Sequence, residues 1–254
     1  MKVKSKLMLC AMALVSSQSL FAHTTFQTRV ITEGGSGYDS FYNNLVIGHG
    51  CKNGVPGTPN SPVIANTYIW PEFASADVYT SAGIVPNLDP ISIINQPKIS
   101  TMPGTNIFAK GGINWGSDAT FTTPVGAYAW NGNLPGSGAK GLVPMAIGYT
   151  KIVTTSCAKS VTFEVDVLDV CKITTFAGAK ERFVDVWASK VGSIWENVTA
   201  TKDLDAAAKY TVTRSKSNKL PANCKPAIGI DYFIKASPEQ INNQLKIPDI
   251  YPAK

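Results

Sequence analysis

The sequence predicts a mainly β protein whose strands pair in antiparallel sheets. Short runs in which apolar and polar residues alternate recur along the chain, and segments rich in Gly, Pro, Asn and Ser separate them. Alternation is typical of strands with one buried face, and many short strands joined by turn-forming segments are typical of two packed sheets. Helical periodicity is rare. We therefore expect an immunoglobulin/cupredoxin-like β-sandwich with a few short helices.

Residues 1–22 have the layout of a secretory signal peptide. Lysines precede an apolar run from Leu7 to Val15, and a polar stretch ends at Ala22. The apolar run is too short to span a bilayer, and a small residue such as Ala22 suits the position before the cut. We therefore expect the protein to be periplasmic or secreted and the mature chain to begin at His23.

The charge of the mature chain argues against one class of partner. Removing residues 1–22 takes away three lysines and no acidic residue, so the formal net charge falls from +6 to +3. The remaining lysines are scattered and form no basic stripe, which argues against nucleic acid. No second long apolar segment follows the signal, so we expect no membrane anchor.

Four cysteines follow the signal: Cys51, Cys157, Cys171 and Cys224. An even number in an exported chain predicts two disulfides, and the spacings leave all three connectivities open. A thiolate metal site is the weaker interpretation, because no two of these cysteines form a Cys-x-x-Cys pair.

The clearest strand covers residues 161–170, where apolar and polar residues alternate. Its apolar face holds Val161, Phe163, Val165 and Val167. This pattern predicts a strand that is buried on one face only. Further strands are expected at 25–32, 40–48, 64–70, 148–155, 209–215 and 228–234.

Helical signals are confined to the second half of the chain. A helix is expected after Ser237, because this capping residue is followed by a proline and then by a glutamate in the first turn. Residues 203–209 are expected to add a turn or two. The pattern becomes mixed after residue 172, so we expect a sandwich over 23–172 and a C-terminal extension, 173–254, packed on the same unit.

The sequence holds two histidines, His23 and His49. Cleavage before His23 would give this residue a free α-amine, which can chelate one metal ion together with ring Nδ1. A second imidazole would complete a set of neutral nitrogen donors that suits Cu(II). A glycine-containing turn at residues 34–37 lets a strand from His23 pair with a strand that ends near His49. The alternative is that His23 has its place by chance and His49 is a hydrogen-bonded turn residue.

Residues 22–54, "AHTTFQTRVITEGGSGYDSFYNNLVIGHGCKNG", resemble the start of the YcnI-type copper-binding domain family. In that family the mature chain opens with histidine, and many members carry His-Gly-Cys at the end of the next strand. The stretches "VIANTYIWP", "INWGSDATF" and "YAWNGNLP" are similar to later strands of the same domain, so the resemblance covers roughly residues 22–136.

The resemblance implies a β-sandwich with a copper site at its N-terminus. Some family members hold Cu(II) through the amine and ring of the first histidine and a carboxylate at the end of the next strand, with a tryptophan nearby. His23 matches the first ligand, and His49 stands where the carboxylate is expected. Trp187 in "FVDVWAS" is the candidate neighbour, while Trp115 and Trp130 remain possible. A disulfide from Cys51 to a distant cysteine would fix the His49 loop.

The sequence thus predicts an exported copper-binding protein for acquisition, delivery or buffering of Cu(II), with no catalytic role and with another copper protein as donor or acceptor. One alternative is an enzyme similar to the lytic polysaccharide monooxygenases, which also use an N-terminal histidine on copper. Another is a metal-free exported binding module. Glu33 and Asp39 lie in the expected turn, and we interpret them as solvated residues and not as ligands.

Overall fold

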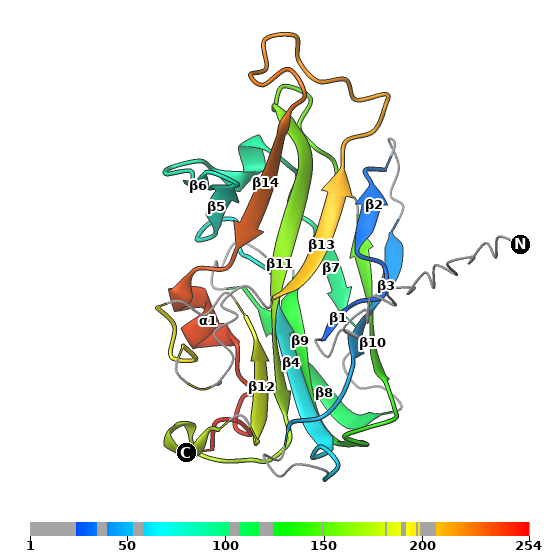
Figure 1. Ribbon diagram of the computed structural model, residues 1–254, viewed down its shortest axis with the longest axis vertical. Coiled ribbons are helices and arrows are strands. Elements are labelled where there is room, and N and C mark those ends of the chain that lie inside the picture. The colour runs from blue at the N-terminus through cyan, green and yellow to red at the C-terminus, as the bar shows by residue number, and fades with distance from the viewer. Residues whose placement is uncertain are drawn as a thin grey trace, which may run out of the picture.

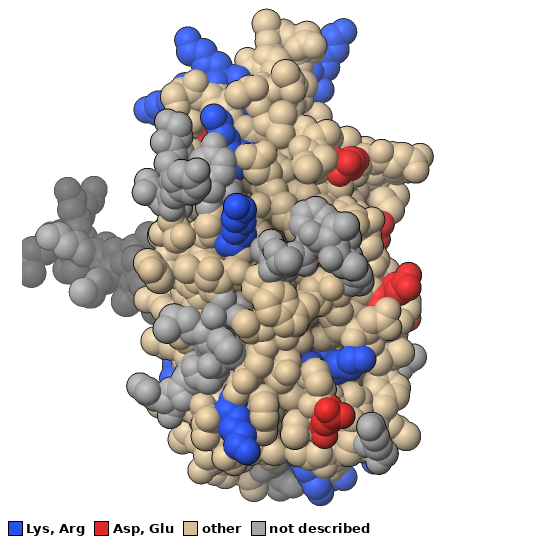
Figure 2. Space-filling view, turned by 180° about the vertical axis from the view of Figure 1, so that it is seen from behind, with Lys and Arg blue, Asp and Glu red and all other residues tan. Residues whose placement is uncertain are grey.

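The computed structural model consists of two β-sheets that pack against each other (Figure 1). Charged side chains are sparse on the face shown in Figure 2. The structure describes residues 24–34, 40–52, 58–101, 107–116, 124–148, 150–180, 182–188, 192–196, 198 and 207–253. The expected signal peptide and His23 lie outside these described residues.

The smaller sheet has four strands in the order β1-β3-β10-β7, and all its pairs are antiparallel. Their bounds are β1 Thr25–Phe26, β3 Phe41–Ile47, β7 Lys98–Thr101 and β10 Gly141–Gly148. Successive side chains of β3 point to opposite faces of the sheet. One face, with Leu45 and Ile47, is fully buried in the core, and Tyr42 on the other face is exposed.

The larger sheet has ten strands. Seven follow the order β6-β5-β14-β11-β4-β9-β8, while β12 and β13 pair with β11, and β2 pairs with β13. Their bounds are β2 Val30–Thr32, β4 Val63–Ile69, β5 Asp77–Thr80, β6 Gly83–Ile84, β8 Phe108–Trp115, β9 Pro124–Leu134, β11 Ala158–Val170, β12 Val184–Trp187, β13 Ala208–Thr213 and β14 Ile230–Lys235.

The expectation of purely antiparallel pairing is wrong for two strand pairs. Strand β14 runs parallel to β11, and β2 runs parallel to β13. Strand β13 ends beside the start of β11. The chain then crosses over that start, and β14 pairs with the opposite edge of β11 (Figure 1). For this reason β14 runs in the same direction as β11.

Strand β11 is the central strand of the larger sheet. Its first half pairs with β13 and β14, and its second half pairs with β4 and β12. Residues 161–170 are all buried, so the prediction of a strand buried on one face only is wrong. A second buried cluster covers the outer face, because Leu168 and Val170 pack there with Trp195, Ile241 and other residues of the later chain.

Two expected strands differ from the prediction. The segment 25–32 forms two strands in different sheets, and the Asn43 side chain bonds both the N–H and the carbonyl oxygen of Thr28 between them. In the segment 148–155, Gly148 ends β10, and the described residues after it, 150–155, form no strand. Instead Ile152 fills the core and pairs through a single bridge.

The helix expected after Ser237 is confirmed as α1, Pro238–Gln244. The Ser237 hydroxyl accepts a hydrogen bond from the N–H of Gln240 at 3.2 Å, as a cap does. Short 3-10 turns η1 and η2 lie at Pro90–Ser92 and Phe176–Gly178. The second expected helix lies mostly outside the described residues, and Ala208 and Lys209 at its end belong to β13. No described helix is long and apolar enough to cross a bilayer.

The prediction of two disulfides is confirmed. Cys51 is bonded to Cys171, which directly follows β11. Cys224 is bonded to Cys157, which directly precedes β11. Two disulfides are typical of proteins that fold outside the reducing cytoplasm.

Candidate functional site

The turn that follows β3 has the sequence His49-Gly50-Cys51. The N–H of Gly50 donates to the carbonyl oxygen of Gly136 at 3.0 Å. A side chain at residue 50 would place its Cβ 1.7 Å from the carbonyl oxygen of Ser61, so only glycine fits there. The disulfide of Cys51 ties the other end of the turn to the larger sheet. These contacts hold the backbone of His49 in one place.

The start of the described chain lies beside this turn. Strand β1 pairs antiparallel with β3, with Thr25 opposite Val46 and Phe26 opposite Leu45. Because the pair is antiparallel, Thr24 lies near the end of β3, which His49 follows. The prediction that these two strands pair is therefore confirmed.

Asp169 is a buried carboxylate that contacts three other segments of the chain. Its Oδ2 accepts hydrogen bonds from the Thr24 hydroxyl at 2.6 Å and from Trp187 Nε1 at 3.0 Å. Its Oδ1 accepts one from Asn66 Nδ2 at 2.7 Å. These four residues form the Asp169 cluster, which joins the chain start to β4, β11 and β12.

The strand register explains how these residues meet. Asp169 of β11 lies opposite Asn66 of β4 on one side and opposite Asp185 of β12 on the other. Paired residues point to the same face of a sheet, so the three side chains form a row across neighbouring strands. Trp187 follows Asp185 by two residues and therefore shares that face.

His49 packs against this row. Its Nδ1 lies 3.7 Å from Asp185 Oδ2, and its ring meets the Trp187 ring edge-on with centroids 6.2 Å apart. The same Nδ1 lies 2.5 Å from the carbonyl oxygen of Gly50. A carbonyl oxygen only accepts, so this contact requires a proton on Nδ1, and of the two neutral tautomers it selects the one with the lone pair on Nε2. The side chain is 15% exposed, which leaves part of the ring open to solvent.

The protonation of Asp169 reflects two opposing effects. Burial raises the pKa of its carboxyl group, because the charged form loses its hydration. Hydrogen bonds from Thr24, Asn66 and Trp187, together with the nearby ring of His49, act to lower that pKa. The net effect is a raised pKa, so the loss of hydration outweighs the three donors.

The described residues contain no complete metal site. Among them, no group of three or more His, Cys, Asp or Glu side chains is arranged to hold a metal ion. The His49 ring and the Asp185 carboxylate lie side by side, while both oxygens of Asp169 already accept hydrogen bonds. His23, the other predicted ligand, lies outside the described residues.

The three candidate tryptophans occupy different parts of the fold. Trp187 lies beside His49, as described above. Trp115 ends β8 and is 56% exposed, and Trp130 packs on the outer face of the larger sheet against the second buried cluster. The structure therefore places Trp187 next to His49, one of the two predicted ligands.

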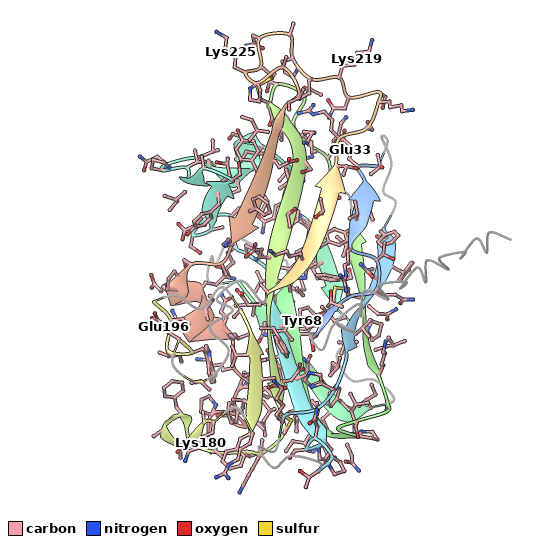
Figure 3. The ribbon with its side chains drawn as sticks, viewed as in Figure 1. Glu33, Tyr68, Lys180, Glu196, Lys219 and Lys225 are labelled. Atoms are coloured by element: carbon pink, nitrogen blue, oxygen red, sulfur yellow. A yellow bond between two sulfur atoms is a disulfide. The ribbon has the colours of Figure 1, made fainter. Side chains whose placement is uncertain are left out.

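Glu33 is not the solvated turn residue that the sequence predicts. It is buried, and its two oxygens accept hydrogen bonds from the N–H groups of Ile152 and Ser215 and from the Asn218 side chain. Figure 3 shows it near the ends of β2 and β13, where it joins neighbouring loops. Asp39, the other acidic residue of the expected turn, lies outside the described residues.

Sequence reasoning missed Asp169 and Asp185. The sequence did hold one signal for Asp169. It follows Val165 and Val167 at every second position, so it shares their core-facing side of the strand, and a charged residue there requires buried hydrogen-bond partners. Asp185 gives no comparable signal, since β12 is short and buried on both faces.

Comparison with models of known protein families and with curated proteins finds no match. The resemblance to the YcnI-type family therefore rests on the sequence motifs alone. What that resemblance implies about copper stays a prediction.

Proposed function

We propose that this chain is an exported protein that holds Cu(II) at the start of its mature form. The α-amine and the imidazole of His23 would supply two donors, and His49 would supply a third. The placement of Thr24, the residue after His23, carries this proposal. Its hydroxyl donates to Asp169, which also accepts from Trp187, and the Trp187 ring meets His49.

Asp169 supports the proposal by anchoring the chain next to the mature amino terminus. The Cα atoms of His23 and Thr24 are about 3.8 Å apart in any trans peptide. A hydrogen bond that fixes Thr24 therefore limits where the amine of His23 can go. Ordering a ligand before the metal arrives lowers the entropic cost of binding.

The surroundings of His49 support a ligand role for its Nε2. Metal-binding histidines commonly donate their other ring N–H to a carboxylate or a backbone carbonyl, which fixes the tautomer and the ring orientation. At Nδ1, His49 has the carbonyl oxygen of Gly50 as its hydrogen-bond partner, and the carboxylate of Asp185 lies 3.7 Å away. We infer that these two contacts orient the His49 ring.

The proposed role is acquisition, delivery or buffering of copper, with another copper protein as donor or acceptor. An ion held at a chain end next to a partly exposed histidine can pass to a partner by ligand exchange. The motif resemblance to the YcnI-type family, and the cupredoxin-like arrangement that it implies, favour this role over a catalytic one. The two disulfides accord with a place outside the cytoplasm.

The experiment is a Cu(II) titration of the secreted, mature protein, whose first residue is established by intact mass. We expect a mass that corresponds to a start at His23 and one equivalent of tightly bound Cu(II). The variants His23→Ala and His49→Ala should each bind at least about tenfold more weakly, since each loses donors from a site of three or four. Because Cu(II) quenches nearby indoles, binding should also quench the fluorescence of Trp187.

The matched control is the wild-type chain with an acetylated α-amine, which keeps both imidazoles and loses only the amine donor. It should bind Cu(II) as weakly as His23→Ala. Equal affinity of the wild type and both alanine variants would overturn the proposal, as would a mature chain that starts elsewhere.

A further inference from the structure

The loop between β13 and β14, residues 214–229, forms one end of the molecule and is here named the apical loop. Figure 1 shows it projecting beyond both sheets. It contains Lys216, Lys219 and Lys225, all exposed, and the sequence has no Asp or Glu from residue 207 to residue 230. Asp231, which follows, is paired with Lys159 at 2.9 Å. The apical loop is therefore a local site of positive charge.

Apolar groups lie among these lysines. Ile228 is 73% exposed, and Pro226 and Ala227 before it are also exposed. Figure 3 shows Lys219 and Lys225 at this end, and Figure 2 shows basic side chains at the same tip from behind. The end of the molecule thus combines cationic side chains with an uncovered aliphatic one.

The apical loop is ordered by bonds to the rest of the protein. Cys224 is bonded to Cys157, and the Asn218 side chain donates to the carbonyl oxygen of Ile152. Arg214 donates to the backbone carbonyl oxygens of Val153 and Ser156 before β11 and of Ala158, its first residue. A surface that is already ordered loses little entropy when a partner binds.

We propose that the apical loop binds an anionic lipid surface. The lysine ammonium groups would contact the phosphates of the headgroups, and Ile228 would enter the boundary between headgroups and acyl chains. Lysines near an anionic bilayer add attraction one by one, and aliphatic side chains add affinity by leaving water. The exposed Ile228 in the same loop favours lipid, because an aliphatic side chain that enters the bilayer adds affinity which charge alone does not supply.

This contact would orient the candidate copper site. Strand β11 begins beside the apical loop and ends at the Asp169 cluster. Its 13 residues span about 40 Å at the usual rise of a strand. If the apical loop contacts the membrane, His49 lies at the end of the molecule that faces away from it. A soluble partner can then reach His49. The proposal does not depend on copper binding.

The test measures co-sedimentation of the copper-free mature protein with vesicles. One set contains phosphatidylcholine alone, and the other contains phosphatidylcholine mixed with phosphatidylglycerol. We expect binding to the anionic vesicles only, and loss of that binding at high salt. The triple variant Lys216→Gln, Lys219→Gln, Lys225→Gln should lower the partition coefficient roughly 100-fold, since each lysine contributes about fivefold. Ile228→Ser should lower it by about tenfold.

The matched control is the triple variant Lys110→Gln, Lys140→Gln, Lys180→Gln, which removes the same charge from exposed positions outside the apical loop. Figure 3 shows Lys180 at the opposite end of the molecule. This control should bind as the wild type does. An equal loss in both triple variants, or no binding to anionic vesicles at low salt, would overturn the proposal. Displacement by polyglutamate together with full binding by Ile228→Ser would reassign the loop to an acidic protein partner.

Discussion

Asp169 is the residue on which the candidate site depends. Its hydrogen-bond partners Thr24, Asn66 and Trp187 come from separate segments, and Thr24 is 145 positions away in the sequence. One buried carboxylate thus specifies where the chain start lies relative to β4 and β12. A carboxylate in such a place requires all its donors, because each lost partner leaves a charge less well solvated.

Replacing Thr24 by valine tests this anchoring. Valine keeps the shape of threonine but removes the hydroxyl that donates to Asp169 at 2.6 Å. We expect the free energy of unfolding, measured in urea on the mature protein, to fall by about 2 kcal/mol, as for a hydrogen bond to a charged group. Cu(II) affinity should fall with it. Thr24→Ser keeps the hydroxyl and should behave almost as the wild type, and a serine variant as weak as the valine one would refute the anchoring role.

The His49-Gly50-Cys51 turn shows how a short element positions a functional side chain. The disulfide of Cys51 and the close approach to Ser61 restrict its backbone from both sides. The His-Gly-Cys spacing is therefore a structural requirement as well as a chemical one, since His49 can only face Asp185 if residue 50 has no side chain.

Substituting Gly50 by alanine should destabilise the turn. The new Cβ would meet the carbonyl oxygen of Ser61 at 1.7 Å, so the backbone must move. We expect a loss of about 1–3 kcal/mol, measured by thermal unfolding, as for other overpacked sites. Gly34→Ala is the control, because a Cβ there meets nothing within 4 Å. The free energy of unfolding of this control should stay within about 0.5 kcal/mol of the wild type. Similar losses of stability in both variants would contradict the steric explanation.

The start of helix α1 and its docking on the sheet are specified in different ways. The start of α1 depends on Ser237 and its neighbours, which are adjacent in the sequence, so the element was predictable. Its docking depends on Gln240, whose side chain bonds the backbone of Trp70 and of Glu72. That contact spans most of the chain and has no signature in the local pattern.

The molecule as a whole is organised along β11. The disulfide Cys157–Cys224 and the apical loop lie at its start, and the disulfide Cys51–Cys171 and the Asp169 cluster lie at its end. The two proposed binding surfaces are thereby kept apart on one continuous strand. Each can be altered by substitution without direct contact with the other.

The buried tyrosines make the stability of the whole molecule sensitive to alkaline pH. Burial raises the pKa of Tyr68 and of Tyr210 above the ordinary value near 10. The folded protein then keeps protons that the unfolded chain releases. The free energy of unfolding should therefore hold steady below about pH 10 and fall as the pH rises further.

Urea unfolding at a series of pH values from about 8 to about 11 measures this effect. The double variant Tyr68→Phe, Tyr210→Phe should show a shallower fall than the wild type. Tyr42→Phe, at an exposed position of β3, is the control and should leave the slope unchanged. A slope that is the same in the double variant and in the wild type would assign the effect to other groups.

The sequence by itself determined the local elements. Runs of β-prone residues between turn-rich segments predicted β3, β4 and β13, the capping serine predicted α1, and the cysteine count predicted two disulfides. The positions of the glycines between β1 and β3 also allowed the pairing of these two strands. These features follow from residues that are close in sequence or from the chemistry of single residue types.

Tertiary structure decided which strands lie next to each other. Alternation fixes the face that a side chain occupies but not the strand beside it, so the parallel placement of β14 and the burial of β11 on both faces were not predictable. The same holds for Asp169, Asp185 and Asn66, which meet only because three distant strands share a register. Such pairings depend on the packing of the whole core, which no local pattern of residues records.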